Sequence, residues 1–230
     1  MGTLFRDISR AVRAPLNKRS ALKKLARFHS SPREIDEIVD NGMNLSTHGL
    51  YRVDSVQKRS EILSLVKRVA ALKPKYIFEI GTCNGGTLFM WSNIATKKVV
   101  SCDLFKNQYR GELYTHFSPP GSGCVVKALI GDSHDPAFKH QVEQEFAGEK
   151  VDFLFIDGDH SEQGVEADFN NFKNLVREGG IIAFHDVIQN QPLSANQVYY
   201  FWERIKTQYR HEEFIDSADQ CGFGIGLLYV

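Results

Sequence analysis

Short apolar runs alternate with longer amphipathic stretches along residues 55–230. Continuous apolar runs are typical of strands buried on both faces, and apolar residues that recur every three or four positions are typical of helices packed on one side. The expected strands lie at 76–80, 99–103, 125–130, 151–157, 181–186, 212–216 and 222–230. Their alternation with helices predicts an α/β fold: a Rossmann-like, doubly wound, mostly parallel seven-stranded sheet with helices on both faces.

Turn and capping residues mark the expected helix ends. Asp135-Pro136 predicts an N-cap followed by proline in the first helical turn. The helix after the fourth strand is expected to stop at Gly179-Gly180. Asp159 has capping-box spacing to Glu162, so it is predicted to cap that helix.

The first 54 residues follow another pattern. Segment 1–30 is basic and amphipathic and contains Pro15, which predicts two short helices broken at the proline. Residues 31–54 predict a helical turn and then a polar loop. The expected organisation is therefore a basic helical N-terminal extension, 1–54, and a main domain, 55–230.

Charge excludes one class of partner and leaves others open. The formal net charge of zero gives no sign of nucleic-acid binding. Residues 1–33, however, hold nine Lys or Arg against the single Asp7. This basic segment fits a cap packed on the main domain, and it also fits peripheral contact with a membrane surface or with another chain, a second copy in a homo-oligomer included.

The cysteines and the hydropathy of the chain give an expectation of where in the cell the protein is located. The four cysteines are scattered and form no C-x-x-C pair, which predicts free thiols in a reducing, cytoplasmic setting. No apolar run approaches the roughly 18 residues needed to cross a bilayer. A cytoplasmic location, with membrane association through the basic segment left open, is expected.

Carboxylates stand at the exits of the five predicted parallel strands. Ligands of open α/β sheets bind outside the carboxyl ends of the strands, near the point where the strand order reverses. The function is therefore expected in the residues that follow each strand. These exits are 79–81, Asp103, 131–133, 157–160 and 185–186.

A glycine-rich loop and an aspartate suggest a nucleoside ligand. Gly81, Gly85 and Gly86 join the first of these strands to its helix, where glycine allows a tight turn or a close approach of a ligand. Asp103 follows Gly81 by 22 residues, at the end of the second strand, where a carboxylate can accept both ribose hydroxyls. Neither a G-x-G-x-x-G nor a P-loop pattern is present. The pair of features favours a nucleoside cofactor.

Two neighbouring strand exits carry acid/base groups. If the fourth and fifth strands lie side by side, Asp157, His185 and Asp186 come together, and such a group forms either a metal site or a hydrogen-bonded acid/base cluster. His160 follows Asp157 by three positions, and an imidazole suits a general base at neutral pH.

The chain resembles the class I S-adenosylmethionine-dependent methyltransferases, and within them the branch of cephalosporin hydroxylase-like proteins and macrolide sugar O-methyltransferases. The resemblance runs from about Gln57 to Val230. Its most specific part is FLFIDGDHSEQGVEADFNNFKNLVREGGIIAFHDV, and KPKYIFEIGTCNGGTLFMW, VVSCDLF, LIGDSHDP, FWERIKTQY and GIGLLYV also carry it.

The resemblance implies roles for named residues. Glu79, Gly81, Gly85 and Gly86 would border the methionine part of S-adenosylmethionine, and Asp103 would bind its ribose. Asp132 and Ser133 would flank the adenine. His160 would be the general base. Asp157 and an acidic pair at 185 and 186 would hold Mg²⁺.

One of these positions departs from the family pattern. His185 stands where the pattern has an acidic residue, and imidazole suits Mn²⁺, Fe²⁺ or Zn²⁺ better than Mg²⁺. Three interpretations stay open. A divalent metal other than Mg²⁺ is bound by Asp157, His185 and Asp186; or Mg²⁺ or another divalent metal is bound by Asp157 and Asp186 and His185 is no ligand; or no metal is used.

The expected function is methyl transfer to a hydroxyl of a small-molecule or sugar acceptor. A nucleotide-binding Rossmann oxidoreductase and a non-catalytic partner protein with the same fold are the alternatives. Candidate acceptor elements are the loops 42–52 and 189–196 and four tyrosines, all of which also fit plain packing. The tyrosines are Tyr109, Tyr114, Tyr199 and Tyr200.

Overall fold

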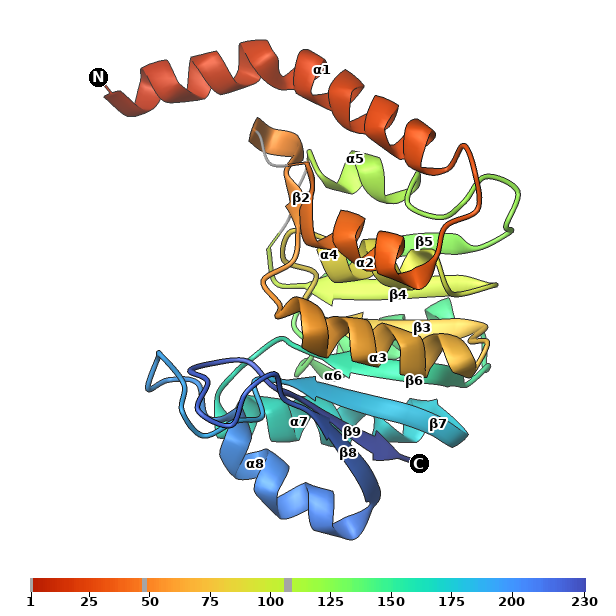
Figure 1. The fold of residues 1–230 in the computed structure, drawn as a ribbon, viewed down its shortest axis with the longest axis vertical. Helices are drawn as coiled ribbons and strands as arrows, with labels where there is room; N and C mark the ends of the chain where they lie inside the picture. The colour runs from red at the N-terminus through yellow and green to blue at the C-terminus, as the bar shows by residue number, and fades with distance from the viewer. Residues whose placement is uncertain (1, 47–48, 106–108) are drawn as a thin grey trace.

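A seven-stranded sheet forms the centre of the computed structural model, which describes residues 2–46, 49–105 and 109–230 (Figure 1). Its strand order is β5-β4-β3-β6-β7-β9-β8. Neighbouring strands from β5 to β7 are parallel, whereas β9 runs antiparallel to both β7 and β8. The predicted mostly parallel seven-stranded sheet is confirmed. The strands are β3 (Tyr76–Ile80), β4 (Lys98–Asp103), β5 (Val125–Ile130), β6 (Val151–Ile156), β7 (Val176–His185), β8 (Arg210–Phe214) and β9 (Ile225–Tyr229).

Helices cover both faces of the sheet because alternate strand residues are apolar on each side. On β6, Phe153 and Phe155 face one core and Leu154 and Ile156 face the other. The first core is covered by α3 (Arg59–Ala71), α4 (Gly86–Ser92), α5 (Gly111–Tyr114) and the N-terminal helices. The second is covered by α6 (Pro136–Glu145), α7 (Glu162–Phe172) and α8 (Val198–Ile205), with η3 (Lys206–Gln208) after α8.

The strand order reverses between β3 and β6. The chain goes from β3 outward to β4 and β5, then returns to place β6 on the other side of β3. The exits of β3 and β6 therefore lie side by side at the switch point, where a ligand pocket is expected.

The N-terminal segment differs from its prediction. One helix, α1 (Gly2–Phe28), continues through Pro15, where two helices were expected. Proline removes its own backbone donor and bends a helix without always ending it, and Figure 1 shows α1 as an arched helix above α5. Contact of α1 with a membrane or another chain stays a prediction, and no described helix is both long and apolar enough to span a bilayer.

Residues 35–46 and 49–54 form regular elements in the part of the chain where a helical turn and a polar loop were predicted. They comprise α2 (Ile35–Asn44), β1 (Leu45–Ser46), η1 (Gly49–Tyr51) and β2 (Val53–Asp54). The helix forms because Ile38, Val39 and Gly42 share a buried face and Glu34 with Glu37 makes a capping box.

This segment packs directly on the glycine-rich loop. A Cβ built on Gly86 would lie 2.4 Å from the carbonyl oxygen of Gly42 and 2.4 Å from the carbonyl carbon of Asp54. Only glycine allows that approach. The predicted boundary between an N-terminal extension and a main domain at residue 55 therefore stays a prediction. The residues on its two sides are packed against each other.

Gly179 and Gly180 do not stop a helix, so that prediction is wrong. Helix α7 ends at Phe172, η2 (Lys173–Leu175) follows, and both glycines lie inside β7. The register between β6 and β7 shifts between Val151 and Phe153, and Gly179 has a φ of +74°. The glycines thus permit a β-bulge. Asp135, in contrast, caps α6 as predicted.

Glu79 is a buried carboxyl that links β3, β4 and α4. It is fully inaccessible to solvent, and its oxygens accept hydrogen bonds from Trp91 Nε1 (2.8 Å) and Ser101 Oγ (2.6 Å). Burial raises the pKa of Glu79 to about 7, against the opposing effect of these hydrogen bonds.

We expect Glu79→Gln to change how stability depends on pH. The unfolded chain loses this proton near pH 4.5 and the folded chain keeps it to about 7, so burial of Glu79 costs stability progressively as pH rises through that window. The free energy of unfolding of Glu79→Gln relative to the parent should increase between pH 5 and pH 8 by on the order of 2 to 3 kcal/mol.

Urea unfolding at both pH values measures this difference. The exposed Glu149→Gln serves as the matched control and should follow the parent at both pH values. Parallel behaviour of Glu79→Gln and the parent across the range would contradict the raised pKa.

Candidate active site

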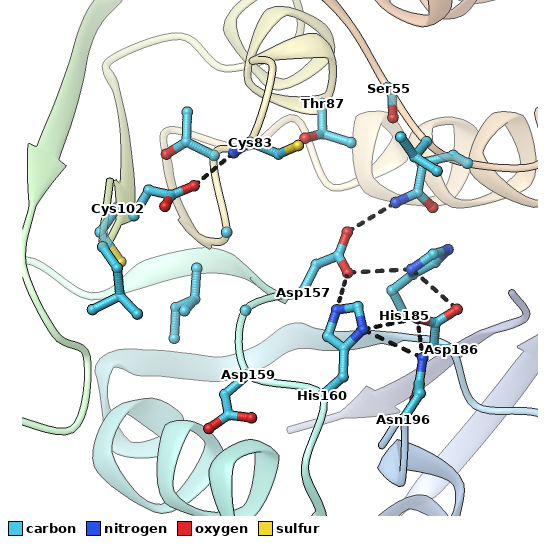
Figure 2. Close-up of a pocket in the computed structure, with 18 of the residues that line it drawn as sticks. Ser55, Cys83, Thr87, Cys102, Asp157, Asp159, His160, His185, Asp186 and Asn196 are labelled. Atoms are coloured by element: carbon cyan, nitrogen blue, oxygen red, sulfur yellow. Dashed lines mark hydrogen bonds and ion pairs between the residues drawn. The ribbon is translucent and has the colours of Figure 1, made fainter. Parts of the chain in front are cut away.

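A cavity of about 780 Å³ opens at the carboxyl ends of the parallel strands (Figure 2). Its walls are the loops that follow β3, β4, β5, β6 and β7, together with residues from 54–57, 191–196 and 222–223. This volume suits a nucleoside-sized ligand together with part of a second molecule. The predicted strand exits thus enclose one site.

The loops after β3 and β6 touch each other at Gly81. This glycine has a φ of +100°, and a Cβ built on it would lie 1.9 Å from the carbonyl oxygen of Asp157. No other residue fits there without moving the β6 exit. The contact places Thr82 and Cys83 along one wall of the cavity and Asp157 on the adjoining wall.

Asp103 lies at the end of β4 and is oriented by backbone donors. Its Oδ2 accepts from Cys83 N (2.8 Å) and its Oδ1 from Phe105 N (3.0 Å). Each carboxylate oxygen can accept a further hydrogen bond, so Asp103 keeps acceptor capacity toward the cavity that it lines.

The loop after β5 is held from behind by α7. Asn171 Nδ2 donates to the carbonyl of Ser133 (3.1 Å), and His134 Nε2 lies 3.3 Å from the carboxylate of Asp168. Asp168 is fully buried, and burial raises its pKa to about 6. The same carboxylate lies 3.4 Å from a Cβ built on Gly158. Asp168 therefore faces His134 of one cavity loop and lies near Gly158 of another, a position that sequence reasoning missed.

Of the seven predicted cofactor residues, five line the cavity and two do not. Glu79 lies behind the wall in its hydrogen bonds with Trp91 and Ser101, and Gly85 faces the ring of Tyr114, 2.7 Å from a built Cβ. Contact of these two with a cofactor is therefore not supported by the geometry. The five that line the cavity are Gly81, Gly86, Asp103, Asp132 and Ser133, and their cofactor contacts stay predictions.

Asp157 is shared by two imidazoles (Figure 2). Its Oδ1 lies 3.2 Å from His160 Nε2 and 3.2 Å from His185 Nδ1. Its Oδ2 accepts from Gln57 Nε2 (2.9 Å), which comes from the loop before α3. The exits of β6 and β7 thus meet as expected from strands that lie side by side.

Asp186 holds the other side of His160. Its Oδ2 lies 3.2 Å from His160 Nδ1 and accepts from Asn196 Nδ2 (2.6 Å). Its Oδ1 accepts from the backbone N–H of Phe223 (3.0 Å). Asp186 has a φ of +64°, an uncommon backbone conformation for a residue other than glycine, and such positions cluster at functional sites.

Opposite charges set the protonation of this cluster. Burial alone would raise the pKa of Asp157, but His185 and His160 together hold it well below its usual range. Burial alone would lower the pKa of His185, yet Asp157 raises it to about 9. The hydrogen bond to Asp157 raises the pKa of His160, and the neighbouring His185 opposes that rise. The two neighbouring carboxylates therefore favour the protonated form of His185.

The predicted metal ligands come together, but their arrangement does not fit Mg²⁺. Asp157 Oδ1 faces two imidazoles, and both oxygens of Asp186 already accept hydrogen bonds. Among the described residues, no group of three His, Cys, Asp or Glu has a geometry that could hold an ion. Mg²⁺ requires near-octahedral oxygen ligands. The described contacts form a hydrogen-bonded acid/base cluster, and the binding of a divalent metal there stays a prediction.

Asp159 does not cap α7, so that prediction is wrong. The N-cap is Ser161, whose Oγ accepts from Gly164 N (3.0 Å). Asp159 accepts from Ser161 N (2.8 Å) and points away from the cluster toward α7 (Figure 2). The β6 exit loop is two residues longer than the capping-box spacing assumed, because residues 157–160 line the cavity before the helix begins.

The acceptor elements are partly those predicted. Segment 189–196 contributes Gln191, Pro192, Leu193 and Asn196 to the wall, whereas the described part of 42–52 contributes none. None of the four predicted tyrosines lines this cavity. Gln57 and Phe223 were missed, because no local pattern marks a residue that reaches the site from another loop, and Asn196 was predicted only as part of the segment 189–196.

Comparisons with known proteins agree with this geometry. Residues 78–187 match the family model described as a methyltransferase domain. An uncharacterised protein of Acanthamoeba polyphaga mimivirus is 33% identical over 119 residues, which are 47% of this chain and 49% of that protein. The match thus spans about half the length of the curated relative.

Solved methyltransferase structures share the fold. An O-methyltransferase from Bacillus cereus, in complex with S-adenosylhomocysteine, has a TM-score of 0.56 and 18% identity and covers 92% of this chain and 98% of its own. The mycinamycin-pathway methyltransferase MycE, in complex with Mg, S-adenosylhomocysteine and mycinamycin VI, has a TM-score of 0.58 and 15% identity and covers 87% of this chain and 55% of its own. The O-methyltransferase TomG from Streptomyces achromogenes, in complex with S-adenosylmethionine, has a TM-score of 0.54 and 14% identity and covers 87% of this chain and 91% of its own.

The family match, the strand order and the cavity at the switch point agree with one another. Residues 78–187 match a methyltransferase domain, and the chain has the fold of the solved class I S-adenosylmethionine-dependent methyltransferases. The predicted resemblance is confirmed, and the family match disfavours the oxidoreductase alternative.

We expect Asp168→Asn to weaken cofactor binding about tenfold. The amide lacks the negative charge that attracts His134, so the loop 131–134 loses support on the side opposite the cavity. Calorimetric titration of S-adenosylhomocysteine measures the effect. Glu166→Gln, on the exposed side of the same helix, is the control, and an unchanged dissociation constant for Asp168→Asn would contradict the role.

Proposed function

We propose that the protein transfers a methyl group from S-adenosylmethionine to a hydroxyl oxygen of a small-molecule acceptor, with His160 as the general base. The observation that carries the proposal is the position of His160 between Asp157 and Asp186, with 38% of its side chain exposed at the cavity. The neighbours' S-adenosylhomocysteine and S-adenosylmethionine complexes support the cofactor, and the MycE complex supports a small-molecule acceptor.

The two contacts of His160 give it an orienting partner and a reactive side. Asp186 Oδ2 lies 3.2 Å from Nδ1 and Asn196 Nδ2 lies 3.3 Å from it, so this side of the ring is held in place and the carboxylate stabilises the imidazolium that forms. Nε2 contacts Asp157 at 3.2 Å, and this contact can be exchanged for one with an acceptor hydroxyl, since catalytic hydrogen bonds often tighten only when substrate binds. Nε2 then takes the proton of that hydroxyl.

His185 keeps the base usable. Two carboxylates beside His160 favour its protonated form, which cannot act as a base. The positive charge of His185 offsets that effect because it faces both Asp157 and Asp186, at 3.2 and 3.5 Å.

The cofactor, when bound, supplies an intrinsically electrophilic methyl group. The chain's residues then need only align the acceptor oxygen and remove its proton. Gly81, Asp103 and the loop 131–134 would hold the cofactor. The acid/base cluster on the adjoining wall would hold the acceptor.

Replacement of His160 tests whether this residue acts in methyl transfer and not in cofactor binding. We expect His160→Gln to lower kcat by a factor of about 10² to 10⁴, which is the usual contribution of a general base. The dissociation constant of S-adenosylhomocysteine should stay within about twofold, because the glutamine amide can still contact Asp157 or Asp186. Methyl-transfer assays and calorimetry measure the two quantities.

The exposed His140→Gln is the matched control and should leave both quantities unchanged. Equal loss of cofactor binding and turnover in His160→Gln would contradict the base assignment. Tight cofactor binding by the parent with no turnover on any acceptor would favour the non-catalytic alternative.

We further propose that transfer does not require Mg²⁺. The carboxylates of Asp157 and Asp186 are compensated by imidazoles and hydrogen bonds, so a cation is not needed to neutralise them. The parent's turnover should stay within about twofold after treatment with EDTA, and Mg²⁺ should not raise its melting temperature. Loss of turnover that Mg²⁺ restores would overturn the proposal.

His185→Asp provides a matched comparison. It removes the imidazolium and places a third carboxylate beside Asp157 and Asp186, so the cluster gains repulsion and oxygen ligands. Mg²⁺ should therefore raise the melting temperature of this variant and leave that of the parent unchanged.

A further inference from the structure

Exposed apolar side chains surround the mouth of the cavity. Val56 is 64% exposed, Leu193 70% and Phe105 82%, and all three line the cavity. Single exposed apolar residues are common on protein surfaces, but several that line one cavity mark a surface that an apolar ligand covers.

Two of these side chains lie on segments that contribute to the acid/base cluster, where the methyl acceptor is proposed to bind. Val56 immediately precedes Gln57, which donates to Asp157, and Leu193 lies three residues before Asn196, which donates to Asp186. Phe105, in contrast, follows Asp103 at the predicted ribose end. Val56 and Leu193 therefore lie on the two segments that also contribute Gln57 and Asn196 to the acid/base cluster.

The cavity is lined by more acidic than basic side chains. Among the described residues that line it, none is Lys or Arg, three are histidines and six are aspartates. The three imidazoles already face the carboxylates of Asp168 and Asp157, so a phosphate buried there would compete with these carboxylates for the imidazoles and would be repelled by them. The six aspartates are Asp54, Asp103, Asp132, Asp157, Asp159 and Asp186.

We propose that the acceptor is an uncharged or cationic hydroxyl compound whose apolar body packs on Val56 and Leu193, and that phosphorylated and nucleotide-linked sugars are excluded. This inference rests on the proposed function, because it assigns the cluster side of the cavity to the acceptor. Apolar contact would supply the affinity, and the hydroxyl would reach His160 from that contact.

Binding of a probe series to the protein saturated with S-adenosylhomocysteine tests the proposal. The probes are 4-methylphenol, 4-ethylphenol, 4-propylphenol and 4-butylphenol, together with their phosphate monoesters, measured by calorimetry. We expect affinity for the phenols to rise about threefold per methylene, as burial of a methylene group predicts, and the phosphate esters to bind at least tenfold more weakly.

Two variants locate the apolar contact. Val56→Ser and Leu193→Ser should each reduce the gain per methylene to less than about twofold while the dissociation constant of S-adenosylhomocysteine stays unchanged. Both positions are exposed, so folding should be retained. Ile215→Ser, at an exposed apolar residue outside the cavity, is the control.

Three outcomes would overturn the inference: phosphate esters that bind as well as the phenols, a chain-length dependence that survives in both variants, or no saturable binding of any phenol. The calorimetric experiment measures binding alone and does not depend on methyl transfer. Normal phenol binding with no turnover on any acceptor would count against the proposed function and leave the acceptor class supported.

Discussion

The close approach of the Gly81 and Asp157 backbones is the constraint on which the site depends. The amide of Asp157 donates to the carbonyl of Ile80 (2.9 Å), which extends the β3–β6 pairing to the ends of both strands. A side chain at residue 81 would push the two exits apart. Because the strand order reverses there, this contact joins the predicted cofactor wall to the acid/base wall.

Charge compensation is the second requirement of the cluster. The carboxylates of Asp157 and Asp186 would repel each other without a positive charge beside them. In this chain, His185 faces both Asp157 and Asp186. Unlike a metal ion, a histidine side chain is part of the chain and does not have to be bound from solution. Unlike a metal ion, it also offers no coordination position to an acceptor oxygen. Proton transfer by His160 is the chemistry proposed for this arrangement.

Sequence patterns predicted the sheet and most of the polar residues at the strand ends. They did not predict which residues of other segments contact these polar residues. Gly81, Asp103, Asp157 and His160 could be predicted because each stands at a strand end, where periodicity breaks. Glu79 also stands near a strand end, yet its side chain alternates to the buried face beneath α4. Nearness to the end of a strand does not by itself show whether a side chain points into the cavity or into the core beneath a helix.

The sequence by itself determined the alternation of strands and helices, the seven-stranded sheet and the concentration of carboxylates at one edge, because hydrophobic periodicity and turn residues act locally. Only the tertiary structure decided that Gln57 bonds to Asp157 across 100 residues, that Asn196 bonds to Asp186, and that Asp168 lies close to two loops of the cavity. Such contacts depend on how separate loops pack. The protonation of His185 is decided in the same way, since burial and two carboxylates from different strand exits act on it together.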